Sequence, residues 1–350
     1  MGKLRIRMLS TATSVSGQGV GSAYIEQVAL VREQQDVFEV FEKGERGKAD
    51  INHVHTVNPT FYLRMGKRTV NVCYVHFLPD TLDGSIKLPK PIFAIFKRYV
   101  RAFYRKADEI VVVNPIFIEP LTKLGVGEDR ITYIPNFVSS DSFHPLSSTE
   151  KAGIRERLGI GKDAFVVLGV GQVQTRKGVS DFLQVARENP DLSFVWAGGF
   201  SFGRMTDGYA QLKKAMENPP RNVKFLGIVE RKRMNEVYNA ADLLFMPSYA
   251  ELFPMSILEA ASAGVPFLLR DLDLYKRILF DDYEVGTDVS SFSSKVKELS
   301  EDPEAYRRAK EKADRIREFY SKEHVAAIWR EYYPRIYQKH KSDKGKRLRG

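Results

Sequence analysis

The sequence predicts an α/β protein made of two doubly wound domains, and three observations support this fold class. The chain has 350 residues, which exceeds the usual size of a single hydrophobic core. Short β-branched runs alternate with longer helical patterns, which favours parallel sheets covered by helices. The alternation stops at a Ser- and Pro-rich stretch at 136–153 and then starts again. We therefore expect one domain at 1–145, a second at 146–325, and a C-terminal helix with a basic tail at 326–350 that returns to the first domain.

The expected strands are apolar runs bounded by turn residues. They are 3–9, 36–42, 51–57, 68–77, 109–114 and 130–136 in the first half, and 165–173, 192–199, 223–229 and 242–248 in the second. Helical patterns separate them, among them 22–34, 115–125, 178–188, 208–217, 231–240 and 255–263. Because open α/β sheets bind ligands outside the carboxyl ends of their strands, functional residues are expected just after these runs.

The composition favours an ordinary globular protein of a reducing compartment. Hydrophobic residues make up 43% and charged residues 28% of the chain, which excludes a disordered or fibrous class. The single cysteine, Cys73, cannot form an intramolecular disulfide and makes a Cys-rich metal site implausible. The N-terminal residues lack the apolar core of a signal peptide, and no apolar run approaches the roughly 18 residues that a spanning helix needs. We expect a cytoplasmic protein that does not cross a membrane.

The net charge of +10 is concentrated in two segments. Residues 87–106 carry seven Lys or Arg and no acidic residue, and residues 339–350 carry six Lys or Arg against Asp343 alone. These segments contribute +7 and +5, more than the excess of the whole chain, so the remainder is slightly acidic. Local basic surfaces attract polyanions, which here means anionic lipid or nucleic acid.

Two glycine-rich loops each stand between a predicted strand and a predicted helix. The first, SVSGQGVGSAYIEQ at 14–27, would let the backbone approach a phosphate or sugar, and its alternative is a plain tight turn. The second, GVGQVQTRKGVSDF at 169–182, places Arg176 and Lys177 ahead of a helix, where two fixed cations suit a diphosphate. Its alternative is a solvated basic turn. The first loop does not match the dinucleotide fingerprint, and the second does not match the P-loop.

The stretch YAELFPMSILEA at 249–260 carries two carboxylates in an otherwise apolar or small run. Glu251 is expected in the loop between a strand and a helix, and Glu259 about one turn into that helix. A buried glutamate is costly unless it is paired or hydrogen-bonded, so each needs a partner, either ligand or protein. Sugar hydroxyls suit the loop carboxylate, and the adjacent hydroxyls of a ribose suit the helical one. The alternative is that Glu251 caps the helix and Glu259 meets a lysine.

Two histidines, His55 and His76, fall at the carboxyl ends of predicted strands, where ligand-binding residues belong. A metal site would need further ligands at compatible spacing, and none are obvious in the sequence. The alternative is that each histidine is a satisfied core residue.

Several motifs together resemble the donor-domain signature of retaining GT-B glycosyltransferases of family 4. They are GQVQTRKG, AGG, FLG, ELFPMSILEA and SAGVPF, and the linker PNFVSSDSF resembles a further element of that family. The resemblance covers essentially the whole chain. More narrowly, GQGVGSAY, HTVNP and YVHFLPDTLDGS resemble bacterial glycolipid synthases, which build the hexosyl- and dihexosyl-diacylglycerol anchors of lipoteichoic acids. The resemblance implies a GT-B fold of two Rossmann-like domains, a nucleotide sugar in the cleft between them, and no metal or other cofactor.

The resemblance also implies roles for individual residues. Arg176 and Lys177 would hold the donor diphosphate, Glu259 the ribose and Glu251 the transferred hexose. His76 would lie near the reacting centre and share the catalytic role with Glu251. The remaining donor-binding positions are Gly19, Gln172, Phe253, Pro254 and Met255. Two of these depart from the family pattern, because many relatives carry arginine in place of Gln172 and glycine in place of Pro254.

The segment PKPIFAIFKRYVRAFYRK predicts a basic amphipathic helix that begins near Pro91. Apolar and aromatic residues recur every three or four positions, and cations fill the other faces. Such a helix suits the interface of an anionic membrane, and the expected contacts are Phe96, Lys97, Arg98, Arg101, Phe103 and Arg105. The alternative is a core helix with a solvated basic face. Nucleic-acid binding is the rival class, but no zinc-ligand set, RNP-like strand or recognition helix accompanies the charge.

These expectations combine in one functional prediction. The chain is predicted to be a retaining, metal-independent hexosyltransferase that moves glucose or galactose from a UDP-sugar to a membrane glycolipid. The expected acceptor is monohexosyl-diacylglycerol and the product dihexosyl-diacylglycerol, a choice that rests on the narrower resemblance alone. The alternative acceptors are diacylglycerol itself and a polyprenyl-linked or soluble glycan. The enzyme would bind peripherally to the inner face of the cell membrane.

Overall fold

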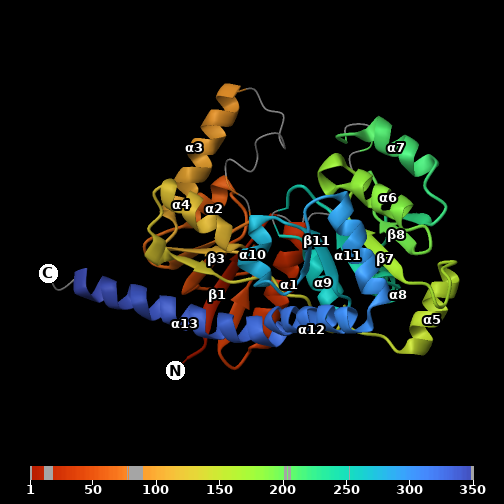
Figure 1. Cartoon of the computed structure of the whole chain (residues 1–350). Coiled ribbons are helices and arrows are strands. Elements are labelled where there is room, and N and C mark those ends of the chain that lie inside the picture. The colour runs from red at the N-terminus through yellow and green to blue at the C-terminus, as the bar shows by residue number, and fades with distance from the viewer. Residues whose placement is uncertain are drawn as a thin grey trace. The chain divides into compact units, whose positions relative to one another are not determined.

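The computed structural model of the protein describes residues 2–11, 19–76, 78, 90–200, 203, 206–251 and 253–347. The chain divides into two compact units. Unit 1 comprises Met1–Asn136 and Lys322–Gly350, and unit 2 comprises Phe137–Ser321. Each unit is built around one six-stranded sheet (Figure 1), which confirms the predicted α/β class with two sheets.

The sheet of unit 1 has the strand order β2-β1-β3-β4-β5-β6, and all neighbouring strands are parallel. Its strands are β1 (Leu4–Leu9), β2 (Phe38–Phe41), β3 (Ile51–Val54), β4 (Val70–Val75), β5 (Glu109–Val112) and β6 (Ile131–Tyr133). Every residue of β3, β4 and β5 is buried, as expected for parallel strands covered on both faces. Each strand lies within one of the six runs predicted for this half of the chain.

Helices connect these strands. They are α1 (Gly19–Glu33), α2 (Pro59–Arg64), α3 (Lys90–Lys106), α4 (Ile118–Lys123) and, from the C-terminal end of the chain, α13 (Lys322–Arg347). The start of α2 follows the expected capping chemistry: the Asn58 side chain accepts from the backbone N–H of Thr60, and Pro59 occupies the first helical turn. Helix α3 begins at Lys90, one residue before the predicted start.

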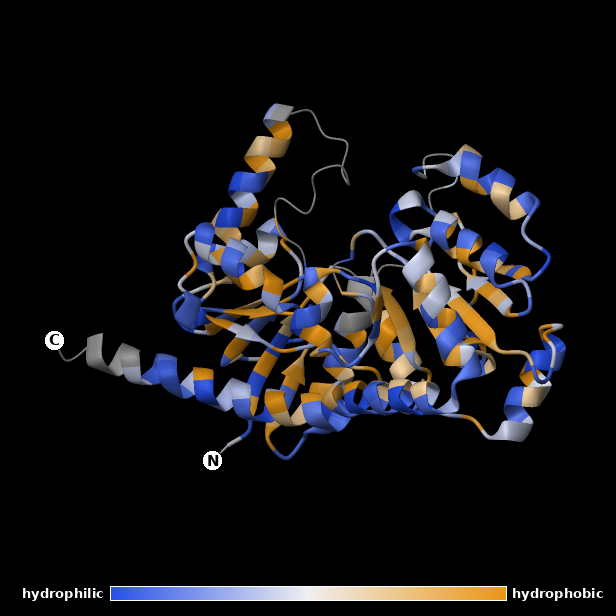
Figure 2. Cartoon of the chain, viewed as in Figure 1, coloured by the Kyte–Doolittle hydropathy of each residue, from blue (hydrophilic) through white to orange (hydrophobic). Residues whose placement is uncertain are grey.

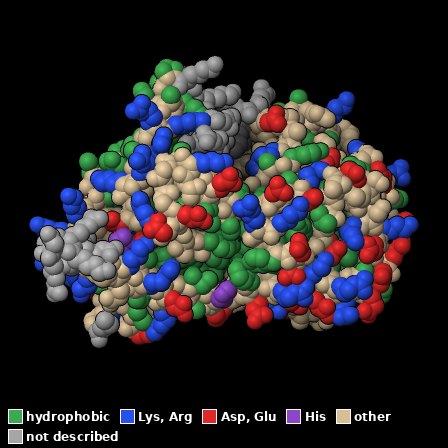
Figure 3. All heavy atoms as spheres, turned by 60° about the vertical axis from the view of Figure 1, so that its left-hand side comes forward, with side chains coloured by type: hydrophobic (Ala, Val, Ile, Leu, Met, Phe, Trp, Pro, Cys, Tyr) green, Lys and Arg blue, Asp and Glu red, His purple; other side chains and the backbone are tan. Residues whose placement is uncertain are grey.

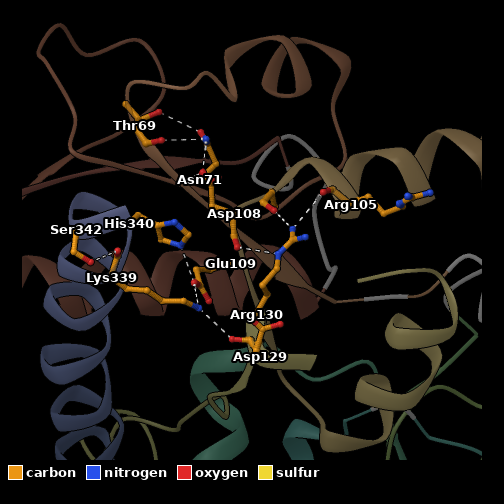
Figure 4. A network of polar contacts seen from close by, with 11 residues as sticks. Thr69, Asn71, Arg105, Asp108, Glu109, Asp129, Arg130, Lys339, His340 and Ser342 are labelled. Carbon is orange, nitrogen blue, oxygen red and sulfur yellow. Dashed lines mark hydrogen bonds and ion pairs between the residues drawn. The ribbon is translucent and has the colours of Figure 1, made fainter. Parts of the chain in front are cut away.

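Helix α13 is fixed to unit 1 by an aromatic contact and a buried ion pair. Trp329 and Tyr333 are buried, and their rings lie 5.3 and 5.8 Å from the ring of His53 on β3. Further along the helix, Lys339 Nζ and His340 Nε2 each lie 2.8 Å from the same oxygen of Glu109, which is buried at the amino end of β5 (Figure 4). The ammonium of Lys339 offsets the desolvation of this carboxylate, and the His340 ring lies within hydrogen-bond distance of the same oxygen.

The sheet of unit 2 has the order β12-β11-β10-β7-β8-β9 and is also entirely parallel. Its strands are β7 (Val166–Val170), β8 (Ser193–Ala197), β9 (Val223–Gly227), β10 (Leu243–Met246), β11 (Phe267–Arg270) and β12 (Glu284–Gly286). This is the strand order of the Rossmann fold, with the reversal between β7 and β10. The sequence predicted the first four of these strands and missed β11 and β12.

The helices of unit 2 pack around a core that is rich in aromatic rings. They are α5 (Ser148–Arg157), α6 (Val179–Glu188), α7 (Tyr209–Glu217), α8 (Met234–Ala240), α9 (Met255–Ser262), α10 (Asp273–Leu279), α11 (Val289–Glu301) and α12 (Pro303–Phe319). The ring of Phe182 on α6 lies 5.0 Å from Trp196 on β8 and 5.7 Å from Phe245 on β10. Figure 2 shows the strands of the sheet as hydrophobic and the helices as mixed, which is the pattern of helices covering a sheet.

The stretch that the sequence suggested as a linker belongs to unit 2. The chain passes between the units after Asn136 and again after Ser321, whereas the predicted boundaries are 145 and 325. Phe143 is buried with its ring 5.9 Å from that of Tyr238, and Leu146 N donates to Asn239 Oδ1. Ser147 then caps α5 in a capping box with Glu150. The Ser- and Pro-rich composition suggested an exposed segment, but its buried phenylalanine anchors it in the second core.

Candidate active site

Two loops of unit 2 meet at the carboxyl edge of its sheet, where the strand order reverses. β7 and β10 are hydrogen-bonded neighbours, although β8 and β9 lie between them in the sequence. The loop after β7 spans 171–178, and the loop after β10 spans 247–254. Their close approach depends on Gly178, whose φ is +68° and whose position leaves no room for a side chain: a Cβ there would lie 2.3 Å from Pro247 O. Open α/β sheets bind their ligands at this point.

The loop contacts bring two predicted cations to one predicted carboxylate. Tyr249 N donates to Arg176 O at 2.8 Å, and the Arg176 guanidinium donates to Ala250 O. Lys177 Nζ lies 2.5 Å from Glu251 Oε1, and Arg176 Nη1 lies 3.5 Å from Oε2. The Glu251 side chain is only 6% exposed, so it is a buried carboxylate with a short charge-assisted contact. The alternative in which Glu251 only caps a helix is not what the structure shows.

Glu259 lies on α9 and is also paired with protein groups. Its Oε1 lies 2.7 Å from Arg231 Nη1, and its Oε2 accepts a hydrogen bond of 2.7 Å from the Tyr238 hydroxyl. The carboxylate is buried, and Tyr238 is fully buried on α8. Burial, with Glu259 beside it, raises the pKa of Tyr238 well above its usual value, so the phenol remains a donor. The sequence alternative named a lysine as the partner; the structure has an arginine and a tyrosine.

The other predicted donor-binding residues have the following places. Gln172 accepts a hydrogen bond of 2.7 Å from Gln174, and both lie on the loop after β7. Phe253 and Pro254 precede α9, and Met255 is its first residue. Pro254 adopts φ −79° and ψ 104° at the N-cap, so the backbone there is one that proline accepts without strain. In unit 1, Gly19 is the first residue of α1, and loop residues 12–18 lie outside the described residues.

A buried ion pair that the sequence analysis missed braces the same loops. Arg270, at the end of β11, pairs with Asp181 on α6, and both side chains are largely buried. The Arg270 guanidinium also donates to Pro247 O at 3.0 Å and lies 4.1 Å from the centre of the Tyr249 ring. The Tyr249 hydroxyl completes the cluster by donating to Asp181 at 2.8 Å. Arg270 therefore holds both ends of the segment that leads into Glu251.

In unit 1, the two predicted histidines stand in a column with a third. His55 follows β3 and His76 follows β4; their rings are stacked with centroids 5.9 Å apart, and His53 lies 4.4 Å from His55. Among the described residues, both ring nitrogens of His55, Nε2 of His53 and Nε2 of His76 are buried without a hydrogen-bond partner. Burial lowers the pKa of His76 from 6.5 to about 4 and that of His53 to about 3. These imidazoles are therefore neutral near pH 7.

The residues described here offer no metal site. No group of three or more His, Cys, Asp or Glu side chains is arranged to hold a metal ion in the described part of the chain.

Helix α3 presents most of its predicted membrane-facing residues to solvent, with one correction. Its amino-terminal part exposes Ile92 (52%) and Ile95 (69%), and Figure 3 shows hydrophobic side chains beside Lys and Arg at the projecting end of this helix. Arg98, Arg101 and Arg105 are exposed, and Phe96 and Lys97 are half-buried. Phe103, predicted to contact the membrane, is fully buried against Tyr62 and Tyr104 and does not take that role. The carboxyl-terminal part of α3 is thus a core helix with a basic outer face.

Comparison with known proteins agrees with this architecture. Residues 150–316 match the family model described as glycosyl transferases group 1, and residues 32–142 match the model of glycosyltransferase family 4. The alpha-galactosylglucosyldiacylglycerol synthase of Streptococcus pneumoniae is 46% identical over 337 residues, which cover 95% of this chain and 89% of that protein. The processive diacylglycerol alpha-glucosyltransferase of Acholeplasma laidlawii is 25% identical and is covered over 77% of its length.

A solved structure shares the fold. Anabaena HepE, solved in complex with UDP and glucose, superimposes with a TM-score of 0.71 at 15% identity, over 93% of this chain and 98% of the other. This likeness confirms the predicted GT-B arrangement of two doubly wound sheets. The chain therefore belongs to the glycosyltransferases of group 1 and family 4, and it is a hexosyltransferase.

Proposed function

We propose that the protein transfers a hexose from a UDP-hexose to monohexosyl-diacylglycerol at the surface of an anionic membrane, with retention of the anomeric configuration. The observation that carries the donor half of this proposal is the meeting of Arg176, Lys177 and Glu251 at the strand reversal of unit 2. Fixed cations beside buried carboxylates suit a ligand that is a diphosphate at one end and a polyol at the other.

The chemistry asked of these residues follows from the charge that develops. The bond between the hexose C1 and the diphosphate breaks, and a bond from C1 to the acceptor oxygen forms on the same face. Negative charge collects on the departing diphosphate, where Lys177 and Arg176 stabilise it without a metal. The diphosphate oxygen takes the proton of the acceptor hydroxyl. We propose that Glu251 orients the hexose through its hydroxyls, that Glu259 holds the ribose, and that neutral His76 contributes to the reaction from unit 1.

The acceptor half is supported by the relatives. The name of the Streptococcus pneumoniae protein gives a galactosylglucosyl-diacylglycerol as its product, and the name of the Acholeplasma laidlawii protein gives diacylglycerol as its acceptor. This product and this acceptor are both diacylglycerol lipids, which remain in a bilayer. We therefore propose monohexosyl-diacylglycerol as the acceptor and leave the donor as UDP-glucose or UDP-galactose.

The membrane contact is proposed for helix α3. No helix among the described residues is long and apolar enough to cross a membrane. The amino-terminal part of α3 instead exposes isoleucines next to cations, and Lys97 lies 4.9 Å from the centre of the Phe93 ring. This combination suits the boundary between anionic headgroups and acyl chains at the inner face of the cell membrane.

Product analysis tests the proposal. The protein is incubated with UDP-glucose or UDP-galactose and with vesicles that contain diacylglycerol, glucosyl-diacylglycerol, or neither plus soluble glycans. We expect a dihexosyl-diacylglycerol with an α-linked second hexose, identified by mass spectrometry and linkage analysis. Transfer only to diacylglycerol or only to a soluble glycan would overturn the proposed acceptor. A β-linked product would overturn retention of the anomeric configuration. Co-sedimentation with anionic vesicles, compared with duplex DNA at matched salt, separates lipid binding from nucleic-acid binding.

A further inference from the structure

Unit 2 contains a buried tyrosine hydroxyl that none of the contacts described above uses. Tyr275 lies in the first turn of α10 and is fully buried. Among the residues that the structure describes, its Oη has no hydrogen-bond partner. A buried hydroxyl without a partner lowers stability, whereas a phenylalanine at the same position would not. The hydroxyl therefore adds nothing to the stability of unit 2 in this state, which points to a role in another state.

The strand order brings Tyr275 to the edge of the sheet that carries Glu251. β10 and β11 are parallel neighbours, and Met246 at the end of β10 is paired with Leu269 near the end of β11. The loop after β10 carries Glu251, and α10 follows β11. Both segments therefore start from the carboxyl edge of adjacent strands, where ligands of open α/β sheets bind.

The charges of the candidate donor site act on this phenol. Burial raises the pKa of Tyr275 well above its usual value, the carboxylate of Glu251 raises it further, and the guanidinium of Arg176 opposes this effect. The phenol is therefore protonated near pH 7 and is a hydrogen-bond donor. Its ring is enclosed in the core, with its centre 6.0 Å from that of the Tyr283 ring. Tyr275 is thus a neutral donor, held by packing, within the electrostatic reach of Glu251.

We infer that Tyr275 is a positioning residue that donates a hydrogen bond to Glu251 while the sugar donor is bound. This inference rests on the proposed function, in which Glu251 orients the hexose and the neighbouring cations hold the diphosphate. Without a donor, Lys177 lies 2.5 Å and Arg176 lies 3.5 Å from the Glu251 carboxylate. A bound diphosphate would share the N–H donors of both cations, so they would hold the carboxylate less firmly. A carboxylate has about four lone-pair sites, so Glu251 can accept from Tyr275 and from the hexose together.

Tyr275→Phe removes only the hydroxyl and tests this inference in the full-length protein. Turnover with a UDP-hexose and the lipid acceptor should fall about tenfold or more, because a hydrogen bond to a charged group is lost in the donor complex. Equilibrium binding of UDP should not change, because UDP lacks the hexose that Glu251 orients. The urea midpoint should stay the same or rise, because the substitution removes a buried hydroxyl that has no partner.

Tyr332→Phe is the matched control. Tyr332 on α13 is buried, and its hydroxyl is likewise without a hydrogen-bond partner in the described part of the chain. It belongs to unit 1, and the proposed function gives it no role. This variant should keep or gain stability and should leave both turnover and UDP binding unchanged.

The outcomes separate this inference from the proposal on which it rests. If the wild type transfers no hexose from a UDP-hexose, the proposed function fails and the inference fails with it. If the wild type is active and Tyr275→Phe has normal turnover, the inference alone is wrong. A Tyr275→Phe protein that is less stable or does not fold would give the hydroxyl a structural role. Equal losses of turnover and UDP affinity would mean that the whole loop has moved. Either result contradicts positioning through Glu251.

Discussion

The contact between Lys177 and Glu251 predicts that stability and activity separate in a double-mutant cycle. We consider Lys177→Met, Glu251→Gln and the double variant. Lys177 Nζ lies 2.5 Å from Glu251 Oε1, and the two side chains are 13% and 6% exposed. Removing one member of a buried ion pair costs about 3–5 kcal/mol because the other charge is left desolvated. Arg176 at 3.5 Å remains as a partly exposed partner for Glu251, so we expect about 2 kcal/mol for Lys177→Met.

The double variant should recover most of that loss without recovering activity. With both groups neutral, no uncompensated charge is buried, and the coupling energy between the two sites should be about 2 kcal/mol. On the proposed function, transfer to the lipid acceptor should stay strongly reduced in all three variants, because the diphosphate would lose its cation or the hexose its carboxylate. A role in folding alone would restore turnover together with stability.

Tryptophan fluorescence provides the stability assay. The chain has two tryptophans, one in each unit: Trp196 on β8 and Trp329 on α13. In a Trp329→Phe background, Trp196 reports on unit 2, and its indole donates to Gly171 O in the loop after β7, which also carries Arg176 and Lys177. Lys213 and Glu217 form an exposed i,i+4 pair at 3.6 Å and serve as the control cycle, with an expected coupling below about 0.5 kcal/mol. A Lys177–Glu251 coupling no larger than this control, or a double variant with normal turnover, would refute the reasoning.

Three further predictions follow from the same structure. Burial lowers the pKa of His53 to about 3, so its contribution to stability is present above pH 6.5 and is lost as the pH falls. Between about pH 7.5 and about pH 4.5 the free energy of unfolding of the wild type should fall by about 3 kcal/mol more than that of His53→Phe. Urea unfolding of unit 1, followed through Trp329, measures this difference. An equal pH dependence in both proteins would contradict this. Arg270→Gln should lower turnover about tenfold or more because Glu251 would be misplaced. Arg270→Lys should recover only part of the lost turnover. An unchanged kcat in Arg270→Gln would exclude a positioning role for this residue. Each basic residue near an anionic surface contributes about 1 kcal/mol to membrane binding. Neutralising Lys97, Arg98 and Arg101 on α3 should therefore weaken vesicle binding about a hundredfold and leave UDP binding intact. Unchanged co-sedimentation with vesicles would show that α3 does not make the membrane contact.

The meeting of Arg176, Lys177 and Glu251 could be predicted because these residues are local to two loops. Arg176 and Lys177 follow one apolar strand, and Glu251 follows another, so a parallel sheet brings them to one edge whatever the details of the packing. The missed strands show the limit of this reasoning. β11 has four residues directly after Pro266, and β12 has three with Val285 exposed. Neither presents a run long enough to distinguish a strand from the helices around it.

Partners set by tertiary structure could not be predicted. Arg231 precedes Glu259 by 28 residues, and Asp181 precedes Arg270 by 89, so no local spacing connects either pair. Helix periodicity on α3 could identify its apolar stripe, but it could not show how much of that stripe packs against the rest of unit 1. Phe103 lies on the covered part because the neighbouring Tyr62 and Tyr104 pack against it. A lone arginine in a charged turn carries no sequence signal for the carboxylate that it meets.

Glu251 and Glu259 are already paired with cations of the protein, and these ion pairs determine how a donor diphosphate can bind beside them. Arg176, Lys177 and Arg231 already neutralise the two carboxylates, with one cation in excess. A dianionic diphosphate entering beside them would leave Glu251 with Arg176 alone, at 3.5 Å, if Lys177 exchanged one partner for the other. An ammonium has three donors, so Lys177 can keep Glu251 on one and offer the others to the diphosphate. On the proposed function, donor binding therefore extends the ion pair instead of opening it, and Glu251 stays paired and oriented to accept hydrogen bonds from the hexose.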